Sequence, residues 1–504
     1  MSERKQPPVD GLTKQSLDKD LAKLVQVEAA ARSISSQVVT HGLALVFLGV
    51  SGLLAAIYAG MATHTVMIIV AAVLGGYMAL NIGANDVANN VSPAVGARAL
   101  TMFGALIIAA IFESAGALIA GGDVVATISK GIIDPNKVAS STVFVWSMMA
   151  ALISAALWIN LATWLGAPVS TTHAVVGGVM GAGIAAGGFG VVNWGTMSGI
   201  AASWVISPLL GGIIAALFLA FIKINLIYQH DKIAAARRWI PLLIAVMASA
   251  FTVYLVMKGL GRVWKPGALM LTAIGIAMFF GSWAVIHPLI RRQSRGMENR
   301  NQSLRKLFRL PLIFSAALLS FAHGANDVAN AIGPLAAIIH SIQSGAIAGK
   351  VAIPIWIMLI GAFGISIGLF LYGPKLVRMV GDKITKMNPM RAYCVALSAA
   401  ITVIVASWLG LPVSSTHIAV GAVFGVGFFR EYYTRHSKRR RSMINDRGGK
   451  ADSKPRKLMP PDEIAYRKLV RRSHFMTIIA AWLITVPATA GLAAVIFYGL
   501  NLIR

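Results

Sequence analysis

The stretch "GANDVAN" occupies residues 83–89 and occurs again, letter for letter, at 324–330. Both copies lie in long apolar stretches, where Asn and Asp are otherwise rare. A second pair, "WLGAPVSTTH" at 164–173 and "WLGLPVSSTH" at 408–417, agrees at eight of ten positions. The two pairs are offset by 241 and 244 residues, so the chain consists of two homologous halves.

The composition places these halves in a membrane. Of 504 residues, 57% are hydrophobic and 12% are charged, whereas about a quarter of a soluble protein is charged. Continuous apolar runs long enough to cross a bilayer as helices predict an all-α polytopic membrane protein, and their lack of alternation excludes a β-barrel. We expect thirteen such segments, at 41–61, 65–97, 99–121, 138–166, 168–187, 195–222, 239–257, 266–290, 310–338, 350–372, 388–410, 412–429 and 475–502.

These segments divide the chain into regions. We expect a soluble N-terminal extension at 1–40, an extra N-terminal span at 41–61, a first transport repeat at 65–222, linking spans at 239–290, and a second transport repeat at 310–502 with a basic cytoplasmic loop at 430–474. Each repeat has about five transmembrane segments. Seven segments separate the starts of the two repeats, and because seven is odd, the repeats should enter the membrane from opposite sides. Such inverted repeats are typical of secondary transporters.

The positive charge of the chain predicts its orientation in the membrane. Of 45 Lys and Arg, 38 lie in the N-terminal region and in loops on one side of the predicted spans. Basic residues remain on the cytoplasmic side, so we expect a cytoplasmic N-terminus and an external C-terminus in a bacterial inner membrane. The net charge of +27 is therefore mainly an orientation signal. The lipid bilayer is the expected partner of the protein, nucleic acid is not, and the basic loop is expected to be solvated or to touch lipid.

Three carboxylates lie well inside predicted spans: Asp86, Glu113 and Asp327. A carboxylate at the centre of a membrane helix costs about 2.5–3.5 kcal/mol and usually marks a transport pathway or a binding site. A neutral carboxyl that bonds a neighbouring helix is the alternative. Asp86 and Asp327 are duplicated together with their surroundings, which favours a site. For Glu113, a role as a cation relay and a role in packing remain equally open.

The neighbours of the two aspartates predict a cation shell on broken helices. Gly and Pro near each motif weaken the helix, and unwound backbone is tolerated at membrane depth only where it is buried or lines a cavity. Carboxylate and amide oxygens together suit a small cation, Na⁺ or H⁺. The residues expected near this coupling cation are Asn85, Asp86, Asn89, Asn326, Asp327 and Asn330, with Glu113 as a further candidate.

The second motif predicts an anion site. Pro168 and Pro412 suit the first turn of a helix, so the hydroxyls that follow should lie at helix N-termini. Free N–H groups and the positive end of the helix dipole favour an anion there, although ordinary N-capping would use the same residues. The expected anion ligands are Ser170, Thr171, Thr172, Ser414, Ser415 and Thr416, together with both aspartates. His173 and His417 are expected to orient their neighbours or cap the motif, with proton transfer as the alternative role.

An anion beside two carboxylates requires positive charge, because like charges repel strongly where water is excluded. Cations or protons bound at the same place would relieve the repulsion, so cation-coupled uptake is the natural mechanism. The anion itself should be able to donate a hydrogen bond to a carboxylate. Hydrogen phosphate has a hydroxyl for this purpose, whereas sulfate at neutral pH does not.

"GANDVANN" and "GANDVANAIGP", with "PVSTTH" and "PVSSTH", resemble the inorganic phosphate transporter family, the low-affinity sodium- or proton-coupled phosphate permeases. The resemblance runs from about residue 65 to the C-terminus. It implies a twelve-span inverted repeat that commonly forms dimers. It also implies a phosphate held between the halves by Asp86, Asp327, Ser170, Thr171, Ser414 and Ser415, with Asn85, Asn89, Asn326 and Asn330 near the coupling cations. The first span and the extension before it depart from the family pattern.

We therefore predict a symporter of inorganic phosphate with Na⁺ or H⁺ that works by alternating access and needs no cofactor. A sulfate permease of the same architecture and an uncoupled anion channel are the alternatives. An enzyme is not expected, because the sequence shows no intramembrane nucleophile–base set or metal cluster.

Overall fold

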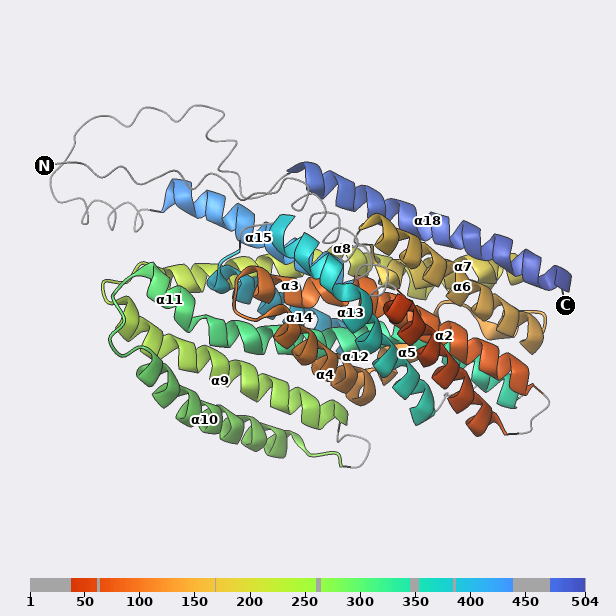
Figure 1. The fold of residues 1–504 in the computed structure, drawn as a ribbon, viewed down its shortest axis with the longest axis horizontal. Coiled ribbons are helices and arrows are strands. Elements are labelled where there is room, and N and C mark those ends of the chain that lie inside the picture. The colour runs from red at the N-terminus through yellow and green to blue at the C-terminus, as the bar shows by residue number, and fades with distance from the viewer. Residues whose placement is uncertain are drawn as a thin grey trace, which may run out of the picture. The chain divides into compact units, whose positions relative to one another are not determined.

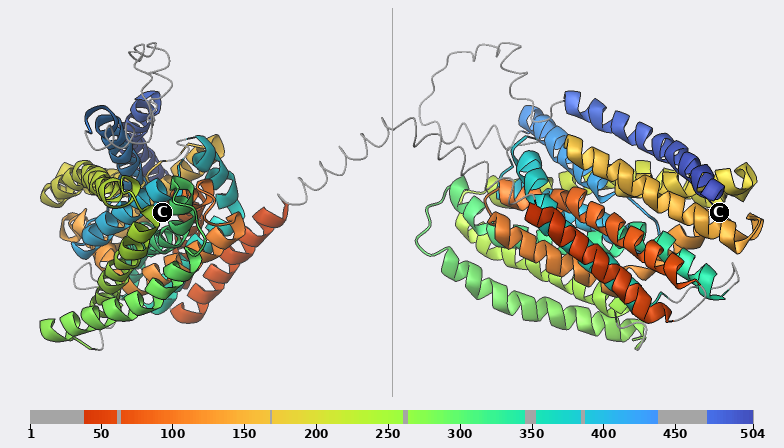
Figure 2. Two further views of the ribbon diagram at one scale, coloured as in Figure 1. Left: turned by 90° about the vertical axis from the view of Figure 1, so that its left-hand side faces the viewer. Right: turned by 45° about the vertical axis from the view of Figure 1, so that its right-hand side comes forward.

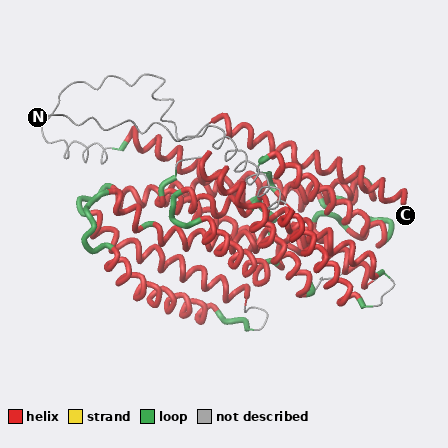
Figure 3. The backbone as a smooth tube through the Cα atoms, viewed as in Figure 1, coloured by secondary structure: helices red, strands yellow, loops and turns green. Residues whose placement is uncertain are grey.

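The computed structural model describes residues 38–60, 64–167, 169–259, 264–344, 353–383, 387–437 and 472–503. Most of the predicted extension at 1–40 and of the basic loop at 430–474 lies outside these residues. The chain forms two units, Met1–Phe47 and Leu48–Arg504, and the account below concerns the second. Its described residues are helical apart from turns, loops and one isolated β-bridge (Figure 3).

The helices follow one another through both predicted repeats (Figure 1). In chain order they are α2 (Thr65–Asn85), α3 (Val87–Gly96), α4 (Met102–Ala120), α5 (Gly122–Ala126), α6 (Ser141–Leu165), α7 (Thr171–Gly187), α8 (Trp194–Ile222), α9 (Lys232–Gly259), α10 (Ala268–Gln293), α11 (Asn301–Leu307), α12 (Arg309–Ser344), α13 (Ile355–Lys383), α14 (Pro389–Trp408), α15 (Ser415–His436) and α18 (Arg472–Ile503). The outer pair, α9 and α10, packs side by side and corresponds to the predicted linking spans (Figure 2).

Fewer helices than predicted segments have the length and apolarity of a membrane span. Among the described residues, eleven helices are long and apolar enough to cross a membrane, against thirteen predicted segments. The two segments that drop out, 168–187 and 412–429, form α7 and α15. Helix α7 has 17 residues and is therefore only about 26 Å long. Helix α15 continues into charged sequence that begins at Arg430.

Each of these two helices is the second, returning helix of a hairpin, formed with α6 or with α14, and its first residues are buried, from Ser170 and from Ser414. Gly166 ends α6 with φ of 71°, and Gly410 follows α14 with φ of 68°, a left-handed conformation that glycine adopts without strain. The outer ends of the first hairpin lie together, since Ile133 and Val192 form a β-bridge. A hairpin that begins and ends on one side adds an even number of crossings. Counted together, α6 and α7 therefore add an even number to the five crossings of α2–α3, α4, α8, α9 and α10. The number of crossings between the starts of the repeats is then odd, and opposite entry remains the prediction.

Helices of one half pack against helices of the other half through glycines. Gly83 in α2 lies so close to α13 that an added Cβ would overlap the carbonyl of Ile365. In the related contact, a Cβ on Gly324 in α12 would overlap the carbonyl of Glu113 in α4. Small residues allow this approach of backbones, which stabilises membrane helix pairs by van der Waals contact. The two copies of the motif are therefore held by equivalent contacts, each made across the repeat boundary.

The hairpins also pack against helices of the opposite half. Gly181 in α7 packs on the backbone of α18 at Ala490, and Gly425 in α15 packs on the backbone of α8 at Gly212. Each return arm thus lies against the last long helix of the opposite half. The halves are interlocked rather than set side by side as two independent bundles.

A contact between α4 and α13 indicates how the halves are related. The hydroxyls of Ser114 and Ser366 lie 2.8 Å apart. The Ser114 hydroxyl donates to the carbonyl of Ala362, and the Ser366 hydroxyl donates to that of Ala110. Because later residues of one helix meet earlier residues of the other, α4 and α13 run antiparallel. This swapped pairing of equivalent helices is the contact that an inverted repeat would give.

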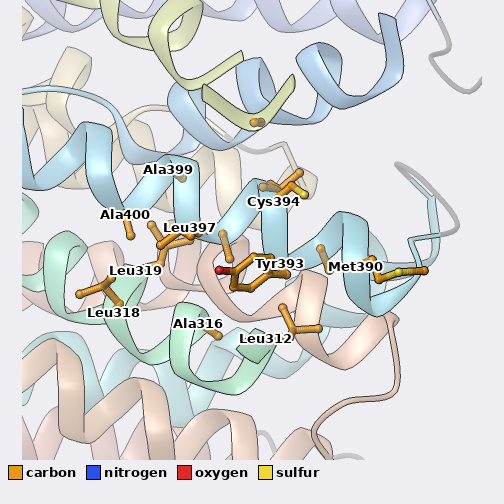
Figure 4. Packing of buried hydrophobic residues seen from close by; sticks show 14 of the residues in the cluster. Leu312, Ala316, Leu318, Leu319, Met390, Tyr393, Cys394, Leu397, Ala399 and Ala400 are labelled. Carbon is orange, nitrogen blue, oxygen red and sulfur yellow. The ribbon is translucent and has the colours of Figure 1, made fainter. Parts of the chain in front are cut away.

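The interior away from the contact between α4 and α13 is apolar. Between α12 and α14, Leu312, Leu319 and Tyr393 pack with the single cysteine, Cys394, which is buried (Figure 4). On the outside, α10 exposes large apolar side chains such as Leu269 and Phe280. Apolar residues both inside and outside, on helices of membrane-spanning length, make this an integral membrane protein.

Candidate functional site

The two duplicated aspartates meet at the centre of the helix bundle. Asp86 lies between α2 and α3 with 2% of its surface exposed, and Asp327 lies in the middle of α12 with 1% exposed. A carboxylate oxygen of each, together with a ring nitrogen of His323, falls within a group whose atoms all lie within 4.8 Å of one another. Residues 241 positions apart in sequence therefore contribute to one buried polar centre.

The predicted broken helices are only partly found. Helix α2 ends at Asn85 and α3 begins at Val87, but Asp86 between them keeps helical dihedral angles, with φ of −84° and ψ of −40°. The second copy of the motif lies within α12, which continues unbroken from Arg309 to Ser344. For α12 the prediction was wrong, because a single Pro inside a long packed helix does not unwind it.

The non-helical backbone lies instead at the two hairpin tips. Asn85 holds the first tip: its amide donates to the Thr163 hydroxyl at 2.9 Å and the Ala167 carbonyl at 3.4 Å, and its oxygen accepts from the Val169 N–H at 3.4 Å. These bonds satisfy backbone groups that no helix can satisfy. Asn85 thereby fixes the position of the tip beside Asp86.

Asn326 holds the second tip in the same way. Its amide donates to the Ser407 hydroxyl at 2.9 Å and the Leu411 carbonyl at 3.1 Å, and its oxygen accepts from the Val413 N–H at 3.2 Å. Both Asn residues were predicted near the coupling cation. The structure places them next to the aspartates, with both ends of each amide engaged by a tip.

Ser170 and Ser414 cap the return arms. The Ser170 hydroxyl accepts from the N–H of His173 at 3.1 Å, and the Ser414 hydroxyl accepts from the N–H of His417 at 3.3 Å. Both contacts are N-caps of the ordinary kind. Each cap directs the N-terminus of its helix, and thus the positive end of the helix dipole, towards the buried centre.

The hydroxyls one and two positions further on reach the carboxylates. Thr171 donates to Asp86 Oδ2 at 2.5 Å, and Thr416, from the other half, donates to Asp86 Oδ1 at 3.2 Å. Ser415 donates to Asp327 Oδ2 at 3.4 Å. Thus Asp86 receives a hydroxyl from each of the two hairpins.

Two further asparagines link the halves. Asn89 donates to the hydroxyl of Thr416 at 2.9 Å, and Asn330 donates to those of Thr171 and Thr172 at 3.2 and 3.1 Å. Thr172 in turn donates to the carbonyl of Val413 at the tip of the other hairpin, at 3.0 Å. The predicted hydroxyl and amide residues therefore gather at the interface between the halves, with none left on the lipid side.

His173 and His417 lie beside the tips and outside this set of hydroxyls. Their rings meet edge to face with centroids 4.4 Å apart, and His173 also packs on Trp204 at 3.8 Å. One imidazole comes from each hairpin. The two rings pack against each other beside the tips, and the orienting role stays a prediction.

His323 is the residue of this centre that sequence reasoning missed. Its Nε2 lies 2.8 Å from Asp327 Oδ2, and its Nδ1 lies 2.6 Å from Glu113 Oε2. Glu113 also accepts from the amide of Asn90 at 2.9 Å. His323 precedes Asp327 by four residues, so helical spacing could have revealed it. Glu113 is fully buried beside the centre, whereas the sequence alone left its role open.

Several buried oxygens of the centre have no donor among the described residues. They are Asp327 Oδ1, Asn330 Oδ1 and Asn90 Oδ1. Buried polar atoms are almost always paired, so unpaired oxygens point to a ligand. Carboxylate and amide oxygens are hard ligands that suit small cations. Hydroxyls and helix N-termini in the same place suit an oxyanion, so the centre can hold both charges together.

An interlocked pair of membrane repeats with such a centre between them defines a protein of the transporter class. Comparison with known proteins identifies the family. The sequence model of the phosphate transporter family matches residues 82–493. The chain belongs to the phosphate transporter family, as the sequence motifs predicted.

Individual relatives agree with this assignment. A protein of Helicobacter pylori strain J99 named "Putative phosphate permease" is 44% identical, over 96% of this chain and 99% of its own length. A protein of the same description from Pyrococcus abyssi is 36% identical, over 84% of this chain and 96% of its own. A solved structure described as "The sodium-dependent phosphate transporter" superposes with a TM-score of 0.75 at 36% identity, over 87% of this chain and all of that one.

Proposed function

We propose that this protein imports inorganic phosphate together with Na⁺ by alternating access, with one phosphate site shared by the two halves. The observation that carries the proposal is the meeting of Asp86 and Asp327 beside two hairpin tips that aim hydroxyls and helix N-termini at them. A transported ion held between the halves can be released to either side when the halves move relative to each other.

Phosphate fits the chemistry of the hairpin tips. Thr171, Thr172, Ser415 and Thr416 supply hydroxyl donors, and the starts of α7 and α15 supply N–H groups and a favourable dipole. Hydrogen phosphate can also donate its own hydroxyl to Asp86 or Asp327, which sulfate at neutral pH cannot do. Ser170 and Ser414 contribute by fixing the tips, because their hydroxyls already cap the helices.

Na⁺ is the coupling ion that the site supports best. Asp86 and the side-chain oxygen of Asn330 offer oxygen ligands of a small hard cation. Asn89 lies beside Thr416 and can turn its oxygen towards the same space. A related solved structure is described as sodium-dependent. Two carboxylates beside a phosphate would repel it, so bound Na⁺ would raise the affinity for phosphate, and each ligand would favour the other.

The membrane setting belongs to the same proposal. We expect a bacterial inner membrane, a cytoplasmic N-terminus and an external C-terminus, on the distribution of Lys and Arg. We also expect a homodimer, as the family resemblance implies. Cysteines introduced in the loops after α8 and α10 test the orientation. A membrane-impermeant thiol reagent added to intact cells should not label either loop, because both should lie in the cytoplasm.

The function is tested by uptake of radiolabelled phosphate into proteoliposomes that contain the purified protein. An inward Na⁺ gradient should drive accumulation above equilibrium, an imposed pH gradient should not replace it, and excess sulfate should not compete. Accumulation driven by the pH gradient alone would identify H⁺ as the coupling ion. Flux that ignores both gradients would contradict the proposal and identify an anion channel.

A further inference from the structure

Glu113 and His323 break the equivalence of the two halves. The offset of 241 residues between the motif copies places Ile82 at the position of His323. The contact between Ser114 and Ser366 relates α4 to α13 with an offset of 252 residues, and this second offset places Ile365 at the position of Glu113. Both isoleucines are fully buried. One half therefore has two ionisable side chains where the other has an apolar pair.

The ionisable pair holds Asp327 from one side. Both ring nitrogens of His323 lie within hydrogen-bond distance of a carboxylate, at 2.8 Å from Asp327 Oδ2 and 2.6 Å from Glu113 Oε2. Neither Glu113 nor His323 is exposed at all. The amide of Asn90 holds Glu113 in turn, at 2.9 Å. One oxygen of Asp327, Oδ2, is thus in ion-pair contact with His323, and Oδ1 is the oxygen left for a ligand.

Asp86 has no such partner. Both of its oxygens meet hydroxyls of the hairpins, those of Thr171 and Thr416. A hydroxyl has two lone pairs and can rotate, so it can bind a cation while it lies next to a carboxylate. The His323 ring, 2.8 Å from Asp327 Oδ2, occupies the place that a cation would take on that oxygen. The surroundings of Asp86 therefore admit a cation on both oxygens. At Asp327, the Oδ2 that meets the Ser415 hydroxyl also lies against His323, so only Oδ1 is open.

We propose that Glu113 and His323 are positioning residues that commit Asp327 Oδ2 to the protein, so that the second half holds one coupling cation fewer than the first. Asp86 supplies the carboxylate of the cation site, and Asp327 is fixed with Oδ1 towards the phosphate. The inference rests on the proposed function and adds a division of labour between the two copies. It also predicts how the number of cations per phosphate can be changed.

The double variant Glu113→Ile with His323→Ile gives the second half the apolar pair of the first. Its packing has a precedent in the chain, in Ile82 and Ile365. Without His323, the carboxylate of Asp327 would be buried with no ionic partner, which is costly unless a cation joins it. The measurement is the charge moved per phosphate, from current and radiolabelled uptake in the same proteoliposomes. The expected result is a rise of one positive charge per phosphate relative to the unchanged protein.

A second variant keeps the test decisive if the double isoleucine variant does not fold. Glu113→Gln with His323→Leu removes the donor to Asp327 with smaller changes of shape, and the same rise is expected. Glu113→Gln alone is the matched control. It leaves His323 able to donate to Asp327, so the charge per phosphate should stay at the value of the unchanged protein.

Equilibrium binding of radiolabelled Na⁺ to the purified variants gives the same answer where transport is lost. One more Na⁺ per chain than in the unchanged protein supports the inference. The same charge ratio, or the same Na⁺ count, in folded variants without His323 would overturn it. An unchanged charge ratio or Na⁺ count in the variants would contradict this inference alone. A failure of the proposed function would appear instead as uncoupled uptake by the unchanged protein.

Discussion

The two hairpin tips are close copies of each other, whereas the two helices that carry the aspartates are not. Each tip has a left-handed glycine, a serine cap and an asparagine that satisfies its backbone. Along the motif helices, Asp86 sits at a break and meets hydroxyls, while Asp327 sits in a continuous helix and meets His323. Similar tips thus face two carboxylates in different surroundings.

This difference indicates that the hairpin tips are constrained by structure, whereas the surroundings of the aspartates can diverge between the halves. A tip needs the same atoms in both halves, because buried backbone must be satisfied wherever it occurs. The environment of a carboxylate can change by single residues that lie outside the repeated text. Substitutions in equivalent tips should therefore have equal effects, and substitutions around the aspartates should have unequal ones.

The largest effect is expected from Asp86→Asn and Asp327→Asn. Removing one member of a buried, hydrogen-bonded charged set costs about 2–5 kcal/mol, so phosphate uptake should fall by more than about 30-fold in each. The two should differ in what remains: Asp86→Asn should lose stimulation by Na⁺, while Asp327→Asn should lose phosphate affinity first. Uptake near the original rate in either variant, measured with and without Na⁺, would remove that residue from the mechanism.

Gly83→Val and Gly324→Val should come next, with equal losses of folded protein. In both cases the new side chain would meet the backbone of the opposite half. Overpacking costs about 1–3 kcal/mol and more where backbone must move. The control is Gly281→Val on α10, where nothing lies near the added Cβ. Size-exclusion profiles and melting temperatures of the three variants make the comparison; an intact Gly324→Val beside a disrupted Gly83→Val would show that the two crossings are not equivalent.

Asn85→Ala and Asn326→Ala should lower the maximal uptake rate by similar factors. Each leaves a backbone N–H and a carbonyl of a buried tip without a partner, at a cost of about 1–3 kcal/mol per group. The loss should appear in the rate rather than in the requirement for Na⁺, because the amides hold tips. A changed Na⁺ dependence in one variant only would mean that this asparagine also binds the cation.

The smallest effects are expected from Ser170→Ala and Ser414→Ala. Loss of an N-cap costs about 1 kcal/mol, which should lower the melting temperature slightly and leave the KM for phosphate within a few-fold of its original value. Thr172→Val serves as a comparison, since its hydroxyl joins the two tips. A much larger rise in KM for either serine variant would show that the serine hydroxyl itself contacts phosphate.

Much of this site can be read from the sequence because its key residues occur twice. Duplication separates Asp86 and Asp327 from ordinary packing residues, and the structure brings both into one buried centre. The family assignment follows from the same repeated text. Hydrophobicity likewise predicts an all-helical membrane protein.

The features of the fold and site that the sequence does not predict depend on tertiary contacts, which local sequence patterns do not indicate. Apolar runs do not reveal that α7 and α15 start inside the protein, because a return arm is as hydrophobic as a span. Gly and Pro near a motif indicate a weakened helix, yet packing keeps α12 intact around Asp327. His323 occurs once, so a search for duplicated residues passes over it.

The central claim is that the two halves share one phosphate site, and equilibrium binding tests it most directly. Purified protein in detergent would be titrated with radiolabelled phosphate at saturating Na⁺, beside Asp86→Asn and Asp327→Asn. We predict one phosphate per chain in the unchanged protein, lost or strongly weakened in both variants. Two phosphates per chain, with each variant losing one, would contradict a shared site and assign a separate site to each half.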